Sequence, residues 1–132
     1  MSASGMSASS VLPMVLPDTS VWIAHFRIGD PRFQQLLRNK RVVAHPFIIS
    51  ELALGSIADR IQTLADLRAL AQAPVADQGE VDRLIEVRQL YAKGIGFVDA
   101  HLIASALIHG DLRIWTLDKR LAELAQSIGV AT

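Results

Sequence analysis

Four acidic residues stand at places in this 132-residue chain where a charge is unusual. Asp18 directly follows the apolar run "MVLP", and Asp118 directly follows "LRIWTL". Glu51 and Asp99 instead interrupt apolar segments of helical spacing, "FIISELAL" and "VDAHLIASALI". Glu51 projects from the apolar face of its segment and is expected to be buried, which is costly for a carboxylate without a partner. These positions favour an arrangement in which the acids meet.

Carboxylates that face one another in a fold favour a divalent cation. Their charges repel, and a dication between them relieves the repulsion. Hard oxygen ligands select Mg²⁺ or Mn²⁺. A metal-bound water with a lowered pKa is a nucleophile suited to attack on a phosphodiester. The four acids therefore indicate metal-dependent phosphoryl chemistry.

Each acid also has an ordinary structural explanation. Asp18 and Asp118 precede helical segments and would serve as N-caps, for which Asp is a preferred residue. Asp99 lies in a first helical turn, where the helix dipole favours an acid. A buried ion pair with an arginine such as Arg113 would explain Glu51. These explanations stay open, although one shared cause accounts for four acids more simply than four separate ones.

The elements that must position these acids alternate between short β-type runs and longer segments of helical spacing. Helices on both faces of a parallel sheet are expected from this alternation, which is the α/β class. Such sheets bind ligands beyond the carboxyl ends of their strands, where Asp18 and Asp118 stand. Strands are expected at 14–17, 41–45, 74–76 and 112–117, with a frayed fifth at 130–132, and helices at 21–26, 31–38, 47–54, 58–72, 79–93, 98–109 and 119–128.

Composition limits the other function classes. The 132 residues suffice for one domain, expected at 11–132, and "MSASGMSASS" at 1–10 is expected to be a disordered scar or extension. The chain has no cysteine, which excludes disulfides and thiolate metal sites. Thirteen basic and thirteen acidic residues balance, so RNA binding would need a local basic patch. A cytoplasmic protein is expected, because the apolar runs are shorter than the ~20 residues of a membrane span.

The segments around the four acids resemble the motifs of the PIN-domain ribonucleases, and most closely those of the VapC toxin group. These segments are "LPDTSVW", "ISELALG", "GFVDAHLIASAL" and "TLDKRLAELA". The acids are separated by 33, 48 and 19 residues, and the resemblance runs from about Val15 to Val130. It implies a PIN-like three-layer α/β/α sandwich with a central parallel sheet of four to five strands. It also implies a Mg²⁺- or Mn²⁺-dependent endoribonuclease.

The resemblance further assigns roles to single residues. Asp18, Glu51 and Asp99 would be the core metal ligands, and Asp118 an outer or second-metal ligand. Two hydroxyl residues, Ser20 and Thr116, look like groups that orient those acids or their waters. The resemblance also implies a structured RNA substrate such as tRNA or rRNA, a VapB-type antitoxin, and a homodimer whose two sites line one RNA-binding groove.

Two basic residues, Lys119 and Arg120, follow Asp118 and are expected to contact substrate, although they would also be explained as exposed first-turn residues.

Two other functions remain as alternatives. One is a catalytically silent PIN-like scaffold that binds RNA or protein, against which the presence of all four acids argues. The other is a metal-dependent phosphatase, which would need a second Asp where Ser20 stands.

Overall fold

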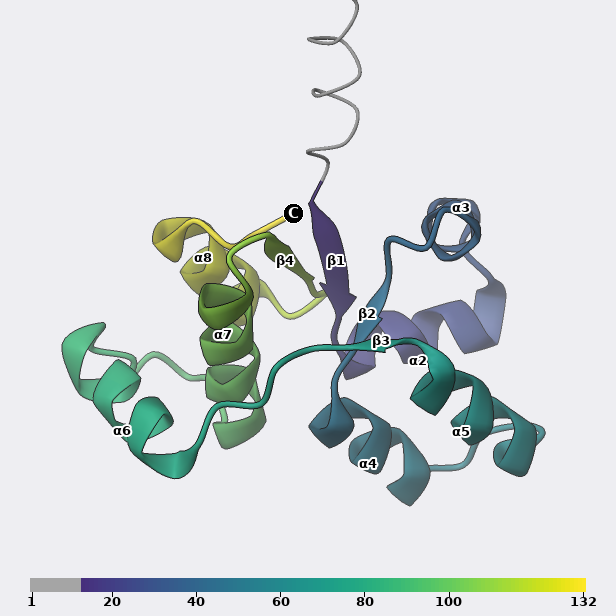
Figure 1. Cartoon of the computed structure of the whole chain (residues 1–132), viewed down its shortest axis with the longest axis horizontal. Helices are drawn as coiled ribbons and strands as arrows, with labels where there is room; N and C mark the ends of the chain where they lie inside the picture. Colours follow the sequence, from purple (N-terminus) through teal and green to yellow (C-terminus); the bar gives the residue numbers. More distant parts are fainter. Residues whose placement is uncertain (1–12) are drawn as a thin grey trace, which may run out of the picture.

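The computed structural model describes residues 13–132, and parallel strands form its centre (Figure 1). Strand β1 (Met14–Pro17) pairs with β4 (Leu112–Trp115), and β2 (Val43–Ala44) pairs with β3 (Ala71–Gln72). Single parallel bridges, Val15 to Val42 and Ile114 to Ala131, extend this pairing. The order across the strands is therefore the segment at Ala131, then β4, β1, β2 and β3. This confirms the expected parallel arrangement of four to five strands.

Helices flank the strands on two sides. In Figure 1, α6, α7 and α8 lie on one side of β1 and β4, and α2 to α5 lie on the other. The described helices are α2 (Thr19–Ile28), α3 (Pro31–Arg38), α4 (Pro46–Leu54), α5 (Arg60–Ala69), α6 (Gln78–Val87), α7 (Phe97–His109) and α8 (Lys119–Ile128). This α/β architecture agrees with the fold class expected from the sequence. The expected extension at 1–10 lies outside the described residues.

Helix α7 forms the centre of the core. Seven consecutive residues of this helix, Ala100 to Ala106, are buried, so the helix is enclosed on nearly all sides. The apolar strand residues Leu16, Leu112 and Ile114 are also buried. A buried Leu, Ile or Phe side chain contributes about 1.5–3 kcal/mol relative to an exposed one, so this packing fixes the strand ends against α7.

The third strand lies earlier in the chain than expected. Residues 74–76 form no strand, and β3 instead occupies Ala71–Gln72, which the spacing had assigned to the end of a helix. Helix α5 ends at Ala69, and the Gln72 amide folds back to donate to the carbonyls of Leu67 at 3.1 Å and Leu70 at 3.0 Å. These bonds satisfy carbonyls that a helix end leaves unpaired.

Helix α6 is shorter than expected. The spacing indicates a helix over 79–93, but α6 ends at Val87. Gln89 and Ala92 adopt φ values of 54° and 59°, a left-handed conformation that interrupts a right-handed helix. The chain from 88 to 96 is therefore a loop that leads into α7. No helix in the described part of the chain is long and apolar enough to cross a membrane.

Candidate active site

The pairing of β1 with β4 places the first and last acids at neighbouring strand ends. Pro17 lies opposite Trp115, and the Asp18 N–H donates to the Trp115 carbonyl at 2.9 Å. Each strand then leads into a helix whose N-cap is the acid, Asp18 for α2 and Asp118 for α8. The carboxyl ends of these two strands are therefore the centre of the site, as expected for a parallel sheet.

Three donors hold the carboxylate of Asp18, which is only 6% exposed. The Ser20 hydroxyl and the Val21 N–H donate to its Oδ1 at 2.5 Å and 3.2 Å. The Thr116 hydroxyl donates to its Oδ2. Because these donors come from both sides of the carboxylate, its orientation is fixed.

The same two hydroxyls also bind the backbone that leads to Asp118. Ser20 accepts from the Leu117 N–H at 3.1 Å, and Thr116 accepts from the Asp118 N–H at 3.0 Å. Each hydroxyl thus connects Asp18 to the segment after β4. These hydrogen bonds hold the Asp18 carboxylate, and the roles that the resemblance implies for Ser20 and Thr116 stay predictions.

Glu51 lies in α4 and is exposed, so the expectation that it is buried is wrong. The buried side of α4 consists of Ile48, Ile49 and Leu52, and Glu51 lies at the edge of that stripe. Its Oε1 accepts from the Thr19 hydroxyl at 2.7 Å. The suggested pairing with Arg113 is also not observed, because that guanidinium donates to the Leu112 carbonyl.

Thr19 is a site residue that the sequence reasoning did not assign. Its hydroxyl joins the start of α2 to Glu51, which is 32 positions away in the chain. The signal was its place beside Asp18 in "PDTSVW". A hydroxyl next to an acid is too common to identify a contact without the positions of α2 and α4.

Asp99 is half-buried in the first turn of α7, and its surroundings connect all four acids. Burial raises the pKa of this carboxyl, and a hydrogen bond from the Gly96 N–H, at 3.0 Å, opposes that rise. The charges of Asp118, Asp18 and Glu51 raise the pKa further. Asp99 therefore lies within electrostatic reach of the other three acids.

The helix-cap explanations also hold for several of these acids. Asp118 is exposed and accepts from the N–H groups of Arg120 at 2.9 Å and Leu121 at 3.1 Å. Asp18 accepts from Val21 in the same way. Capping and membership of an acidic group thus coexist at the same residues, so one does not exclude the other.

The donor set suits a hard divalent cation. Within residues 13–132, no three His, Asp or Glu side chains are grouped closely enough to hold one ion as they stand. Each acid is hydrogen bonded to a donor of its own, for example Glu51 to Thr19 and Asp99 to Gly96. The charged groups that raise the pKa of Asp99, after burial, are all carboxylates, and oxygen ligands of this kind are those that Mg²⁺ and Mn²⁺ take.

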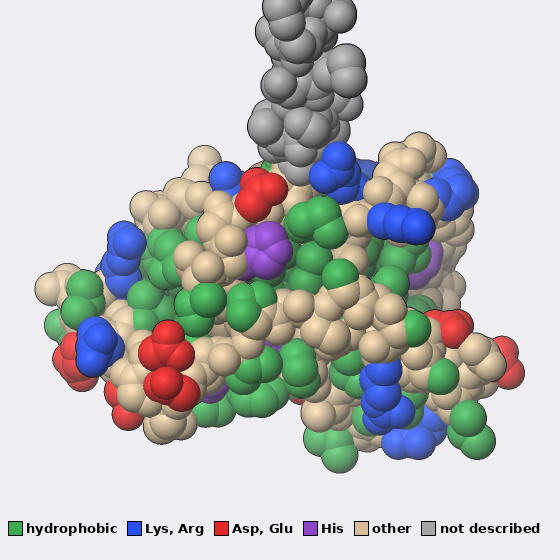
Figure 2. Space-filling model, in the orientation of Figure 1, with side chains coloured by type: hydrophobic (Ala, Val, Ile, Leu, Met, Phe, Trp, Pro, Cys, Tyr) green, Lys and Arg blue, Asp and Glu red, His purple; other side chains and the backbone are tan. Residues whose placement is uncertain are grey.

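The two basic residues after Asp118 have different surroundings. The Lys119 ammonium lies 4.0 Å from Glu123 Oε1, and both side chains are exposed. The Arg120 side chain instead lies against Gly94, in the loop before α7. On the face shown in Figure 2, Lys and Arg side chains are distributed over separate places with acids between them.

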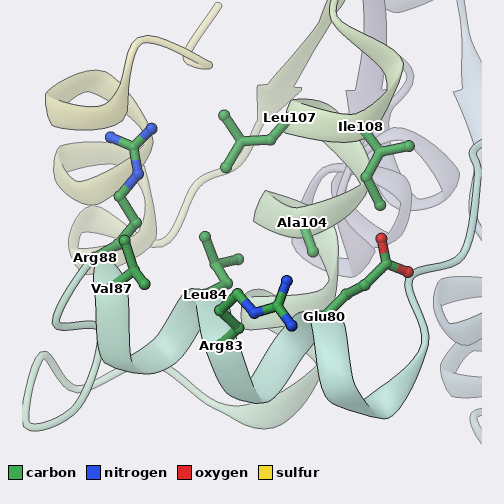
Figure 3. Close-up of a pocket in the computed structure, with 8 residues that line it drawn as sticks. All are labelled: Glu80, Arg83, Leu84, Val87, Arg88, Ala104, Leu107 and Ile108. Atoms are coloured by element: carbon green, nitrogen blue, oxygen red, sulfur yellow. The ribbon is translucent and has the colours of Figure 1, made fainter.

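The four acids of the candidate site do not line the pocket between α6 and α7. That pocket has a volume of about 350 Å³ and an apolar floor that includes Leu84, Ala104 and Leu107, with Arg83 and Arg88 at its edge (Figure 3). The candidate active site is instead an open acidic surface at the strand ends, with Glu51 and Asp118 exposed.

Comparisons with known proteins identify the family. Residues 15–127 match the family model described as PIN domain. Two curated proteins named Ribonuclease VapC32, from the CDC 1551 / Oshkosh and ATCC 25618 / H37Rv strains of Mycobacterium tuberculosis, are each 47% identical over 118 residues, which cover 89% of this chain and 95% of theirs. The crystal structure of PAE2754 from Pyrobaculum aerophilum superposes with a TM-score of 0.64 at 19% identity, covering 92% of this chain and 89% of that one, and shows the same fold. The chain therefore belongs to the PIN domain family, and within that family it is similar to the VapC ribonucleases.

Proposed function

We propose that this chain is a VapC-type toxin that hydrolyses RNA phosphodiester bonds with Mg²⁺ or Mn²⁺ held by Asp18, Glu51, Asp99 and Asp118. The observation that carries this proposal is the arrangement at the strand ends, where donors from Ser20, Val21 and Thr116 hold the buried Asp18 carboxylate beside the segment that leads to Asp118. Burial, and to a smaller extent the charges of the other three acids, raise the pKa of Asp99, which agrees with a place near them. The 47% identity to Ribonuclease VapC32 supports RNA as the substrate class. The oxygen-only donor set supports the choice of metal.

The side chains around the acids would prepare them for this role. Ser20 and Thr116 fix the orientation of Asp18, so its carboxylate does not have to be ordered when a cation binds. Thr19 restrains Glu51, which is otherwise exposed. A Mg²⁺ or Mn²⁺ ion bound by these oxygens would supply an acidified water and neutralise charge on the phosphate. Asp99 must be ionised to contribute, so cation binding should strengthen as pH rises.

The two alternative functions have weaker support. A silent scaffold would not require Asp18 to be buried as a carboxylate with three donors. Glu51 does not separate the two functions in this way, because it is exposed and costs little to keep. An aspartyl-phosphate phosphatase would need an acid at Ser20, whose hydroxyl instead donates to Asp18.

The proposed partners follow from the similarity to VapC proteins. We propose a structured RNA such as tRNA or rRNA as substrate and a VapB-type antitoxin as inhibitor. We also propose a homodimer, with two acidic sites along one RNA-binding groove. The support is the resemblance of the four acidic motifs, together with the identity to Ribonuclease VapC32 over most of both chains.

An RNA cleavage assay with matched variants tests the proposed activity. Purified protein is incubated with total tRNA and rRNA in Mg²⁺ or Mn²⁺, and again in EDTA. We expect cleavage only with metal, and a loss of at least about 100-fold in Asp99→Asn, because even residues that support metal ligands cost 10–100-fold. Asp77→Asn is the control, since Asp77 accepts from the Glu80 N–H as a helix cap and does not belong to the four acids. Cleavage that persists in EDTA, or in folded Asp99→Asn, would contradict the proposal.

A further inference from the structure

The Arg120 side chain crosses directly over Gly94. A Cβ atom at position 94 would lie 2.7 Å from Arg120 Cδ and 2.8 Å from its Nη1, which is closer than real Cβ atoms come. Gly94 also has a φ of 77°, in the region that favours glycine. The glycine therefore leaves the space that the arginine occupies.

Arg120 has no acidic partner in the described part of the chain. The ion pair at the start of α8 is made by the preceding residue, Lys119, with Glu123. Arg120 and Lys93 are both exposed, and they line one shallow pocket together with Glu123, Leu124 and Ser127. The two cations, Lys93 and Arg120, outnumber the one acid, Glu123, so the lining of this pocket carries a net positive charge.

This basic pair lies beside the backbone that holds two of the acids. The Arg120 N–H donates to Asp118, and Gly94 is two residues before Gly96, whose N–H donates to Asp99. A cluster of carboxylates repels a polyanion, so RNA needs positive groups near it to approach the site. The planar guanidinium binds phosphate oxygens through two parallel hydrogen bonds, and the lysine adds a point charge.

We propose that Arg120 and Lys93 bind a backbone phosphate of the RNA next to the acidic site, and that Gly94 helps to place Arg120, because a Cβ at position 94 would push the arginine side chain aside. This inference rests on the proposed function for the identity of the polyanion. It assigns a phosphate-binding role to Lys93, and it distinguishes Arg120 from Lys119, whose ammonium lies 4.0 Å from Glu123 Oε1.

Salt dependence of RNA binding tests the phosphate contacts without any cleavage. Binding of a fluorescein-labelled single-stranded oligouridylate is measured by fluorescence anisotropy in EDTA, over a series of KCl concentrations. Each lost phosphate contact should reduce the slope of log K against log salt by about 0.7. We expect this reduction in Arg120→Ala and in Lys93→Ala. Arg68→Ala, which removes an exposed charge from α5, should leave the slope unchanged.

A pair of glycine variants separates the role of Gly94 from backbone strain. Gly94 and Gly110 have similar φ values, 77° and 85°, but a Cβ at position 110 would meet nothing within 4 Å. We expect Gly94→Ala to reduce the slope, but by less than Arg120→Ala, because the flexible end of Arg120 can move aside without being lost. Gly110→Ala should keep the wild-type slope. The double variant Gly94→Ala/Arg120→Ala should show no further reduction beyond that of Arg120→Ala, since both changes affect the same contact.

The results separate this inference from the proposed function. No RNA binding by the wild type, an unchanged slope in Arg120→Ala, or equal effects of Gly94→Ala and Gly110→Ala would overturn the inference. Failure of metal-dependent cleavage, with the expected slope differences intact, would overturn the proposed hydrolysis and leave the phosphate site in place.

Discussion

Asp18 is the acid whose orientation is most completely fixed by the residues around it. It is buried, and donors from Ser20, Val21 and Thr116 reach both of its oxygens. Charge-assisted hydrogen bonds of this kind are about twice as strong as neutral ones. Asp18 is therefore the most firmly held acid of the site, whereas the carboxylates of Glu51 and Asp118 are exposed and each has hydrogen bonds to only one of its oxygens.

Replacing Thr116 tests how much this fixed carboxylate depends on its donors. Thr116→Val keeps the shape but removes the donor to Asp18 and the acceptor of the Asp118 N–H. We expect a loss of about 1–3 kcal/mol in the free energy of unfolding, because a buried charged group is left without one partner. Urea unfolding at pH 7 measures the loss. Thr116→Ser, which keeps the hydroxyl, should recover most of it, and equal stability of the Val variant and wild type would contradict this account.

The positions of single acids in strands and helices are easier to predict from the sequence than the surroundings of those acids. Asp18, Asp99 and Asp118 could be selected because acids after strands and in first helical turns follow from local pattern. The exposure of Glu51 could not, because it depends on which apolar residues of α4 face the core, and the equally apolar Leu54 is exposed as well. The contact from Thr19 depends on the packing of α2 near α4, which no local pattern records.

At the level of elements, Asp118 serves as both a helix cap and a member of the acidic group. Its Oδ1 accepts from two N–H groups at the start of α8. Asn can make the same cap without the charge, whereas Ala cannot. We therefore expect Asp118→Ala to lose about 1 kcal/mol of stability and Asp118→Asn to lose only a few tenths. Chemical unfolding measures the stabilities, and RNA cleavage should fall in both variants; full cleavage by Asp118→Asn would show that Asp118 is only a cap.

Helix α4, which carries Glu51, begins at a buried histidine. His45 Nδ1 accepts from the Phe47 N–H at 3.0 Å, so Nε2 carries the hydrogen and donates to Ser105 Oγ at 3.1 Å. Burial, and next the charge of His101, lower the pKa of His45 to about 4 from its usual 6.5. Between these values the unfolded chain binds more protons than the folded one, so stability is complete above pH 6.5 and decreases as pH falls toward 4.

His45→Asn tests this pH dependence, because Asn can cap α4 but does not titrate. The wild type should lose about 1.4 kcal/mol per pH unit from His45 within that window, and the variant should lack this contribution. The raised pKa of Asp99 acts with the opposite sign but is common to both proteins. Urea unfolding at several pH values compares the two slopes. Parallel slopes would show that His45 is not the group that titrates.

The elements themselves are predicted well where local signals are strong. Helix α8 agrees at both ends with the expected 119–128, because Asp118 caps its start and Gly129 ends it with a φ of 91°. The expected positions of the third strand and of the end of α6 were wrong. The two residues of β3 are defined by pairing with β2, and the left-handed turn at Gln89 lacks the usual glycine.

At the scale of the whole molecule, the parallel pairing of β1 with β4 joins residues about one hundred positions apart. The Thr116 hydroxyl and Asp18 are 98 positions apart and in contact. Alternation of strands and helices predicted the parallel sheet and the edge at which Asp18 and Asp118 lie, but not the order of the strands. The balanced charge of the chain, with 13 basic and 13 acidic residues, means that RNA binding depends on local groups such as those beside Gly94.

If the four acids form one cation site, Mn²⁺ binding measured by electron paramagnetic resonance should depend on Asp99. Wild type, Asp99→Asn and Asp77→Asn are titrated at pH 7.5, with folding checked by circular dichroism. Asn at position 99 can still accept from the Gly96 N–H, so the start of α7 should remain intact. We predict that wild type and Asp77→Asn bind Mn²⁺ alike and that Asp99→Asn binds at least about 10-fold more weakly. Equal binding by folded Asp99→Asn, or no binding by the wild type, would contradict the account.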